Sequence, residues 1–123
     1  MSDTKTVLVV DDVSANIDIL KDMLCSEFKV KAALKGEKAL IIAQREPHPD
    51  LILLDVLMPE MDGYEVCRQL KADSQTADIP VIFVTGNDSQ DEISKGLGLG
   101  AIGYLTKPVS ADKLADLIGP LFS

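Results

Sequence analysis

The sequence has few residues of the types that most often bind metals or act as nucleophiles: it contains one histidine and two cysteines in 123 residues. His48 lies between Pro47 and Pro49. Without a second histidine, we predict no catalytic or metal-binding role for it. Cys25 and Cys67 lie far apart in helix-like segments. They could form a disulfide or share a metal, but the pattern favours buried free thiols in a cytoplasmic protein.

Long hydrophobic runs and an excess of basic charge are also missing. The first apolar run, residues 7–10, is too short for the core of a secretory signal peptide. No segment has the roughly 18 or more apolar residues of a membrane span. Lysine and arginine number 12 against 20 aspartates and glutamates, which gives a net charge of −8. This charge argues against direct binding to nucleic acid or an anionic membrane, and permits cations or basic proteins as partners.

What is present is typical of one globular domain in the cytoplasm. Hydrophobic residues make up 46% and charged residues 26% of the chain, and no repeat or internal linker is visible. Five short apolar runs are predicted strands: residues 6–10, 29–33, 51–54, 81–84 and 102–105. The first, third and fourth runs are almost continuously apolar, as in strands that are buried on both faces of a parallel sheet.

Amphipathic segments alternate with these runs. Ile17, Leu20 and Leu24 recur at helical spacing. Further helices are predicted over 37–45, from 62 or 63 through 70, over 90–99, and from a cap at Ser110 through 121. Five such units in succession predict an α/β fold, a doubly wound five-stranded parallel sheet with helices on both faces.

Acidic residues follow two of the predicted strands. Asp11 and Asp12 follow the first strand, and Asp55 follows the third. Ligands of such sheets bind outside the carboxyl ends of the strands, where these three carboxylates would converge. Two unit charges about 4 Å apart repel by roughly 4 kcal/mol at an effective dielectric constant near 20. A hard divalent cation such as Mg²⁺, which prefers oxygen ligands, is the simplest group to offset that repulsion.

Two more predicted strands end near polar groups suited to phosphate chemistry. Thr85 and Gly86 follow the fourth strand, and Lys107 and Pro108 come soon after the fifth. Taken singly, each residue is explained by an ordinary turn, cap or exposed charge. Together they suit phosphoryl transfer, because an ionised aspartate is a competent nucleophile and a metal or lysine offsets the transferred negative charge.

These motifs, in this order, resemble the receiver domain of two-component response regulators. The resemblance covers the whole chain and rests on residues 9–12, 54–63, 84–86 and 100–108. It implies the flavodoxin-like strand order 2-1-3-4-5 and a single receiver domain over residues 1–123, with no output domain in this chain. It also implies a signalling protein that catalyses only its own phosphorylation and slow dephosphorylation.

The resemblance implies a role for each matching residue. Asp55 would accept the phosphoryl group. Mg²⁺, or Mn²⁺ in its place, would be held by four groups: Asp11 (mostly through water), Asp12, Asp55 and the backbone carbonyl of Leu57.

Phosphate binding and switching would fall to residues after the fourth strand and around the fifth. Thr85, Gly86 and Lys107 would bind the phosphoryl group, and Tyr104 would turn between outward and inward rotamers. The bond before Pro108 would be cis. Leu57 and Asn87 flank the site, and they predict slow loss of the phosphoryl group.

The expected partners follow from the same resemblance. A sensor histidine kinase or a histidine phosphotransfer protein would donate the phosphoryl group in trans, because this chain has no histidine in a helical donor context. An output domain or target protein would receive the signal. A homodimer could form through the face made by the fourth helix, fifth strand and fifth helix. No direct contact with nucleic acid or membrane is expected.

Three alternatives stay open. A phosphohydrolase of the haloacid-dehalogenase type needs a second acid two residues after the nucleophile. This chain has Leu57 at that position, which counts against this alternative. A dinucleotide-binding domain needs Gly-x-Gly-x-x-Gly after the first strand, but residues 11–16 contain no glycine. A receiver that only mediates interaction, without phosphorylation, would not need the complete set of site residues seen here.

A last expectation concerns local stability. Three closely spaced glycines, Gly96, Gly98 and Gly100, precede the fifth strand. Each glycine inside a helix costs about 1 kcal/mol relative to alanine. We therefore expect residues 95–103 to have low local stability and to become ordered on phosphorylation.

Overall fold

The structure is a computed structural model that describes residues 4–86 and 89–122. Five parallel strands form one sheet in the order β2-β1-β3-β4-β5, which confirms the predicted fold class and strand order. The strands are β1 (Thr6–Val10), β2 (Lys29–Ala33), β3 (Leu51–Asp55), β4 (Val81–Thr85) and β5 (Gly103–Thr106). The last three end one residue later than predicted, because backbone pairing continues through the polar residues at their ends: Asp55 pairs with Val84 and Thr85 with Thr106.

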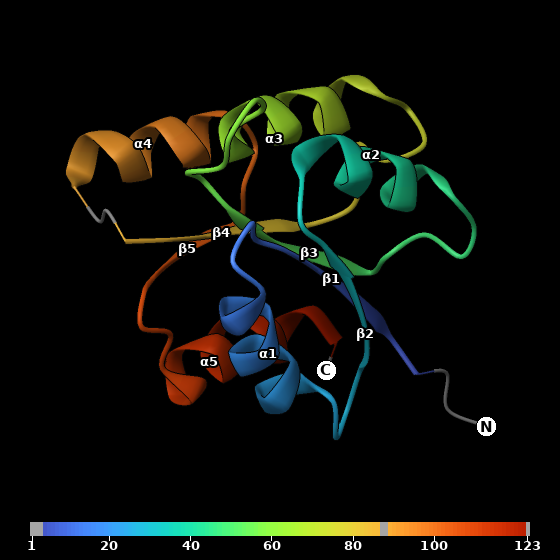
Figure 1. Cartoon of the computed structure of the whole chain (residues 1–123), viewed down its shortest axis with the longest axis vertical. Coiled ribbons are helices and arrows are strands. Elements are labelled where there is room, and N and C mark those ends of the chain that lie inside the picture. Colours follow the sequence, from blue (N-terminus) through green and yellow to red (C-terminus); the bar gives the residue numbers. More distant parts are fainter. Residues whose placement is uncertain (1–3, 87–88, 123) are drawn as a thin grey trace.

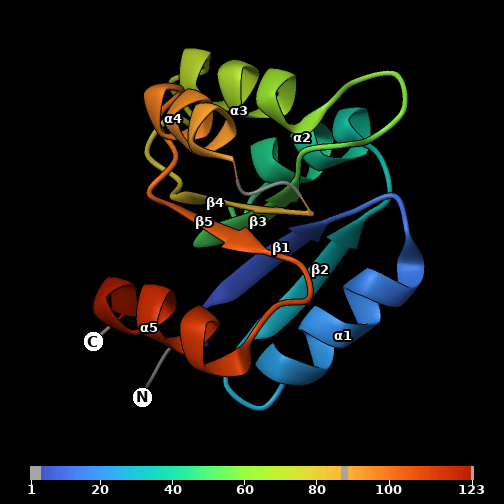
Figure 2. The same ribbon diagram turned by 90° about the vertical axis from the view of Figure 1, so that its left-hand side faces the viewer.

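Helices cover both faces of the sheet. They are α1 (Ser14–Leu24), α2 (Gly36–Gln44), α3 (Gly63–Ala72), α4 (Gln90–Gly98) and α5 (Ala111–Phe122). Figures 1 and 2 show α2, α3 and α4 on one face and α1 and α5 on the other. Two predicted helix starts carry side-chain caps: Asp62 Oδ1 accepts the Glu65 N–H at 2.9 Å, and Ser110 Oγ accepts the Lys113 N–H at 3.4 Å.

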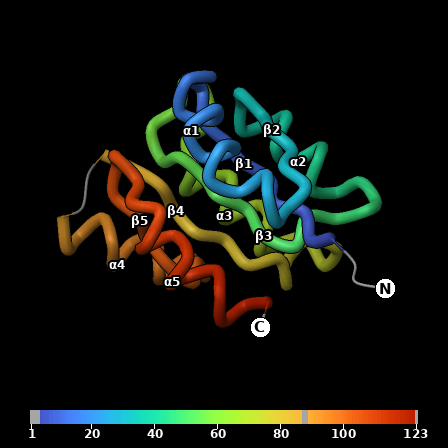
Figure 3. Tube along the Cα trace, turned by 90° about the horizontal axis from the view of Figure 1, so that it is seen from below, coloured from blue at the N-terminus to red at the C-terminus, as the bar shows by residue number. Residues whose placement is uncertain are grey.

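The sheet separates two hydrophobic cores. Every residue of β1, β3 and β4 is buried, and successive side chains alternate between the two faces. Leu8 and Val10 pack toward α2 and α3, whereas Val7 and Val9 pack toward α1 and α5. Seen from below in Figure 3, α1 lies on the β1–β2 side of the sheet and α5 on the β4–β5 side. These cores fix the carboxyl ends of the strands along one edge.

The histidine and the cysteines lie away from that edge. His48 Nδ1 is hydrogen-bonded to the backbone carbonyl of Ala43 at 2.8 Å. Both cysteines are free thiols, and Cys67 is buried as predicted, but Cys25 is exposed. The expectation of two buried thiols is wrong for Cys25, because this residue follows Leu24, the last buried position of α1.

Among the described residues, no helix has the length and apolar character needed to cross a membrane.

Candidate functional site

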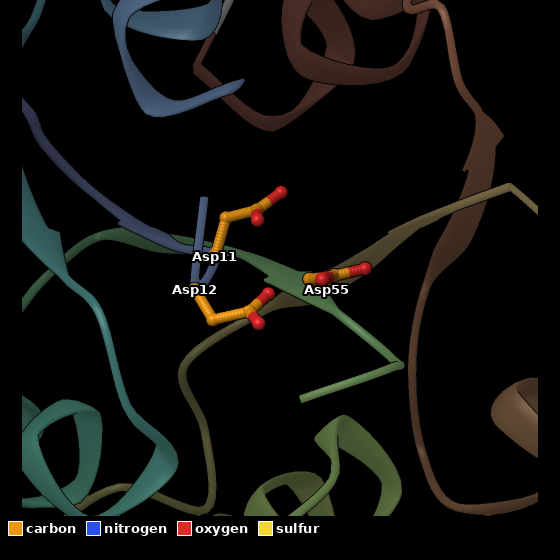
Figure 4. A group of neighbouring side chains, drawn as sticks. All are labelled: Asp11, Asp12 and Asp55. Atoms are coloured by element: carbon orange, nitrogen blue, oxygen red, sulfur yellow. The ribbon is translucent and has the colours of Figure 1, made fainter. Parts of the chain in front are cut away.

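Three carboxylates gather at the carboxyl edge of the sheet. Asp11 and Asp12 directly follow β1, and Asp55 is the last residue of β3, the strand next to β1. One carboxylate oxygen from each residue lies within 4.8 Å of the others. Figure 4 shows the side chains of Asp11 and Asp12 extending to the side on which Asp55 lies. Asp11 and Asp55 are only 2% and 4% exposed, whereas Asp12 is exposed.

The backbone around Asp11 holds its carboxylate in place. Its N–H donates to the carbonyl of Ala33 at 3.1 Å, which ties the end of β1 to the end of β2. Its Oδ1 accepts the N–H of Val13 at 2.9 Å, a turn in which an aspartate side chain bonds to the backbone two residues on. Asp11 is therefore fixed before α1 begins.

Lys107 brings a positive charge to this cluster from the far edge strand. Its Nζ lies 2.8 Å from Asp11 Oδ2 and 3.3 Å from Asp55 Oδ1. Its backbone N–H donates to the carbonyl of Thr85 at 2.8 Å, so the loop after β5 is tied to the end of β4. The Lys107–Pro108 bond is cis. The ammonium group of Lys107 thus forms ion pairs with two nearly buried carboxylates.

The acidity of Asp55 reflects these surroundings. Burial, followed by the negative charge of Asp11, raises the pKa of Asp55 from 3.8 to about 6, although Lys107 acts in the opposite direction. Burial lowers the pKa of Lys107, but the hydrogen bond that Lys107 donates to Asp11 and the negative charge of Asp55 outweigh this effect, so the pKa of Lys107 is raised overall. The lysine therefore stays protonated while Asp55 holds its own proton more tightly than a free aspartate does.

This raised pKa predicts an unusual pH dependence of stability in the absence of metal. The folded state binds the Asp55 proton more tightly than the unfolded state, so the stabilisation is complete below the unfolded pKa of 3.8 and is lost as pH rises through about 6. In EDTA, the unfolding free energy of the wild type minus that of Asp55→Asn should fall by about 1–2 kcal/mol between about pH 4 and about pH 7.5. Urea denaturation measures this difference, and a rise with pH would contradict the assignment.

The donor set suits a hard divalent cation. All three groups are carboxylates, which are the ligands that Mg²⁺ prefers. Three negative charges face a single lysine among the described residues, so one ammonium leaves the cluster short of positive charge. The residues present therefore fit Mg²⁺, with Asp11, Asp12 and Asp55 as the groups that would hold it.

The other residues singled out in the sequence lie at the same edge or just beyond it. Thr85 ends β4 and is buried, and Gly86 follows it in an exposed bend. Leu57 lies two residues after β3 with a side chain that is 71% exposed. Asn87 lies outside the described residues. The roles assigned to these residues stay predictions.

Tyr104 lies on β5 but faces the helices rather than the carboxylates. It is half-buried, and its ring centroid lies 6.1 Å from that of Phe83 on β4. A Cβ at Gly96 of α4 would lie 3.4 Å from the Tyr104 ring and 2.8 Å from the Phe83 ring. Glycine at position 96 therefore lets α4 approach these two rings closely.

The sequence did not reveal the side-chain contacts that hold α3 and α4 together. The Tyr64 hydroxyl donates to the Glu92 carboxylate, and Lys95 Nζ lies 4.5 Å from the centre of the Tyr64 ring. Burial, followed by the Glu92 hydrogen bond, raises the pKa of Tyr64 well above its usual value. Only the apolar spacing of Tyr64 was visible in the sequence, because its partners are 28 residues or more away.

Gly63 is a second residue whose role the sequence did not show. Its N–H donates to the Val56 carbonyl at 2.8 Å. A Cβ there would lie 2.1 Å from the backbone oxygen of Asp55. The first residue of α3 therefore packs directly against the backbone of the candidate nucleophile.

Comparison with known proteins gives a consistent result. The family model described as the response regulator receiver domain matches residues 7–119. The response regulator PleD of Caulobacter vibrioides is 47% identical over 104 residues, which cover 84% of this chain and 23% of PleD. The polar-differentiation response regulator DivK of Brucella ovis is 36% identical over 119 residues, which cover 94% of each protein.

A solved structure has the same fold. The chemotaxis protein CheY4 of Vibrio cholerae superposes with a TM-score of 0.89 at 29% identity, and the match covers 98% of this chain and 100% of CheY4. The chain thus spans less than a quarter of PleD but nearly the whole of DivK and of CheY4.

Proposed function

Since this chain belongs to the response regulator receiver domain family, we propose that it is a phosphoacceptor switch that takes a phosphoryl group onto Asp55. The observation that supports this role most directly is the meeting of Asp11, Asp12, Asp55 and Lys107 at one edge of the sheet. In this proposal Asp55 is the nucleophile because it holds the acceptor position of the receiver motif. Asp11 also contacts Lys107, but its other carboxylate oxygen already accepts the Val13 N–H.

The residues around Asp55 have different roles in phosphoryl transfer. Lys107 holds the Asp55 carboxylate and then pairs with an oxygen of the incoming phosphoryl group. Asp11, Asp12, Asp55 and the Leu57 carbonyl would hold Mg²⁺, which would supply positive charge to offset the charge on the transferring group. Mn²⁺ has the same preference for oxygen and can replace it. Little covalent assistance is needed, because phosphoryl transfer depends mainly on positioning and electrostatics.

Phosphorylation raises the negative charge at Asp55 to about −1.5 to −2. The hydroxyl of Thr85 and the amide of Gly86 lie at the end of the neighbouring strand and bind the new oxygens. Movement of Thr85 changes the space available to Tyr104 on β5, and that ring turns inward. The α4–β5–α5 face then carries the signal.

The partners of this switch are part of the proposal. A sensor histidine kinase or a histidine phosphotransfer protein in the cytoplasm donates the phosphoryl group. An output domain or a target protein binds the α4–β5–α5 face. A homodimer forms through the same face. The net charge of −8 favours protein partners over nucleic acid or anionic membranes.

A phosphohydrolase is the competing enzymatic function. It requires an acid two residues after the nucleophile, and Leu57 holds that position with an exposed, apolar side chain. We therefore propose that dephosphorylation of Asp55 is slow and that the chain acts in signalling, not in substrate turnover. A receiver that only mediates interaction would have no use for the buried pair of carboxylates that share Lys107.

Intact-mass measurement tests this function directly. The protein is incubated with Mg²⁺ and acetyl phosphate or phosphoramidate. Wild type should gain the mass of one phosphoryl group, and EDTA should prevent the gain. Asp55→Asn should gain nothing, whereas Asp62→Asn, which alters an exposed capping acid, should behave as the wild type. Phosphorylation of Asp55→Asn would reject the assignment.

Hydrogen exchange tests the proposed switch. The Glu92 and Lys95 contacts to Tyr64 hold α4 against α3, but glycines at 96 and 98 weaken the helix itself. In the unphosphorylated protein, amides of residues 93–99 should exchange faster than those of α3, and phosphorylation should slow them. Slow exchange over 93–99 before phosphorylation would show that this segment is already ordered.

A further inference from the structure

The edge of the sheet opposite β5 combines positive charge, exposed apolar side chains and an unpaired strand. We propose that this β2–α2 edge, defined as β2, Leu34, Lys35 and the exposed residues of α2 through Ile41, binds an extended acidic segment of a partner protein. The segment would lie alongside β2, with acidic side chains opposite the lysines and an aliphatic side chain against Leu34 and Ile41.

The backbone of β2 provides the first support. β2 is the outermost strand and pairs only with β1 within the described part of the chain. Figures 1 and 2 show it at the margin of the sheet, with α2 on one side and α1 on the other. Alternate residues of such a strand direct their N–H and C=O groups away from the sheet, where an added strand can pair with them.

Charge provides the second support. Residues 29–41 contain four lysines and one glutamate, a net charge of +3 in a chain whose net charge is −8. The lysines are Lys29, Lys31, Lys35 and Lys38. Among residues 4–86 and 89–122, the cations in ion pairs are Lys107 and Arg68, so these four lysines are available to a partner.

The lysines also lie on one side of the sheet. Val30 packs against the core on the α1 side, and Ala33 belongs to the core on the α2 side. Because side chains alternate along a strand, Lys29 and Lys31 lie on the same side as Ala33. They therefore lie on the face of the edge that also carries α2.

An apolar groove on that side provides the third support. It has a volume of about 460 Å³ and is lined by Ala32, Ala33, Leu34, Lys35, Glu37, Lys38 and Ile41. Leu34 is 51% and Ile41 45% exposed. Lysines on an edge strand can serve simply to prevent aggregation, but exposed leucine and isoleucine beside them would oppose that purpose. Their combination selects an acidic, aliphatic segment, and it repels the same basic edge of a second copy.

The position of this edge allows binding without blocking the carboxylate site. Ala33 ends β2, and its carbonyl accepts the Asp11 N–H at 3.1 Å. A segment bound along β2 lies beside the site and at the opposite edge of the sheet from β5. It leaves both the carboxylates and the α4–β5–α5 face accessible.

Fluorescence anisotropy tests the proposal with a labelled ten-residue peptide. Glutamates occupy alternate positions of its first half, valines occupy the corresponding alternate positions of its second half, and serines lie between them, so that acidic and aliphatic side chains face the same side of an added strand. Wild type should bind this peptide, and should not bind matched peptides in which lysine replaces glutamate or proline replaces valine. Lys35→Glu and Leu34→Ser should weaken binding by at least about tenfold. The matched surface controls Lys113→Glu and Ile102→Ser should change it less than about twofold. Asp55→Asn should bind as the wild type, so this test is independent of the phosphoacceptor function.

Several results would overturn the proposal. No binding of the acidic peptide to the wild type would reject the docking site. An equal loss in Lys35→Glu and Lys113→Glu would show attraction to overall charge rather than to this edge. Sedimentation that revealed a dimer abolished by Lys35→Glu would assign the edge to a second copy of the chain instead of a partner.

Discussion

Gly63→Ala should destabilise the folded protein by more than about 3 kcal/mol, a magnitude seen when backbone or core packing is disrupted. A Cβ at this position would lie 2.1 Å from the Asp55 oxygen and 2.9 Å from Val56 Cα. These are backbone atoms of the end of a central strand, so they cannot rotate away as a flexible side chain would. Either α3 or the end of β3 must move.

Urea denaturation of Gly63→Ala measures this loss. Gly119→Ala is the matched control, because Gly119 lies within α5 and a Cβ there meets nothing within 4 Å. The control should change stability by less than about 1 kcal/mol, since the helix preference of alanine over glycine is opposed by the restriction that Pro120 places on the residue before it. Equal stability of Gly63→Ala and the wild type would mean that the start of α3 does not pack against the backbone of Asp55.

The displacement should also affect phosphorylation if Gly63→Ala folds. The backbone of Asp55 would shift relative to Asp11 and Lys107, and misplacement by about 1 Å can reduce a rate by about 100-fold. Comparison with Gly119→Ala at a temperature where both variants are folded separates this effect from loss of folded protein.

Lys107→Met should give the second large effect, with two separate readouts. Without the ammonium group, Asp11 and Asp55 lose the cation that lies 2.8 Å and 3.3 Å from their oxygens. We expect the metal-free protein near neutral pH to lose about 2 kcal/mol of stability, less than for a fully buried pair because the lysine is partly exposed. Phosphorylation by acetyl phosphate should slow by about 100-fold, as when one charged donor is removed from a transition state.

The charge on Asp55 allows a sharper test of the same interaction. In Asp55→Asn a neutral amide replaces the carboxylate next to Lys107. Adding Lys107→Met to Asp55→Asn should therefore cost less stability than adding it to the wild type. Because Mg²⁺ and Lys107 offset the same negative charges, Mg²⁺ should raise the melting temperature of Lys107→Met more than that of the wild type. Lys113→Met, on the exposed surface of α5, serves as the control and should leave rate and stability unchanged. Additive losses in the double variant would contradict the assigned ion pair.

The order of elements along the chain could be predicted because local patterns carry that information. Continuous apolar runs marked β1, β3 and β4, and the helical spacing of Ile17, Leu20 and Leu24 marked α1. The polar residues that end the strands were visible for the same reason. The exposure of Cys25 was missed because the depth of a residue at a helix end depends on how the helix packs, which its own neighbours in sequence do not determine.

Contacts between distant residues could not be predicted in the same way. The sequence placed Tyr64 in a helix, but its bond to Glu92 depends on the separation of α3 and α4. Gly63 looked like part of a helix start, although its glycine is required by an approach to Asp55 that only the packed structure produces. The sequence analysis assigned no role to the lysines at positions 29, 31, 35 and 38, whose grouping beside one groove depends on how α2 packs next to β2.

The sequence by itself determined the α/β class, the five alternating units and the residues available for phosphoryl chemistry, because periodicity and strand ends are local properties. Tertiary structure alone decided which carboxylates share Lys107, which glycine adjoins Asp55, and which edge of the sheet is basic. Those features depend on distances between segments up to 96 residues apart, and such distances are fixed only when both hydrophobic cores have packed against the sheet.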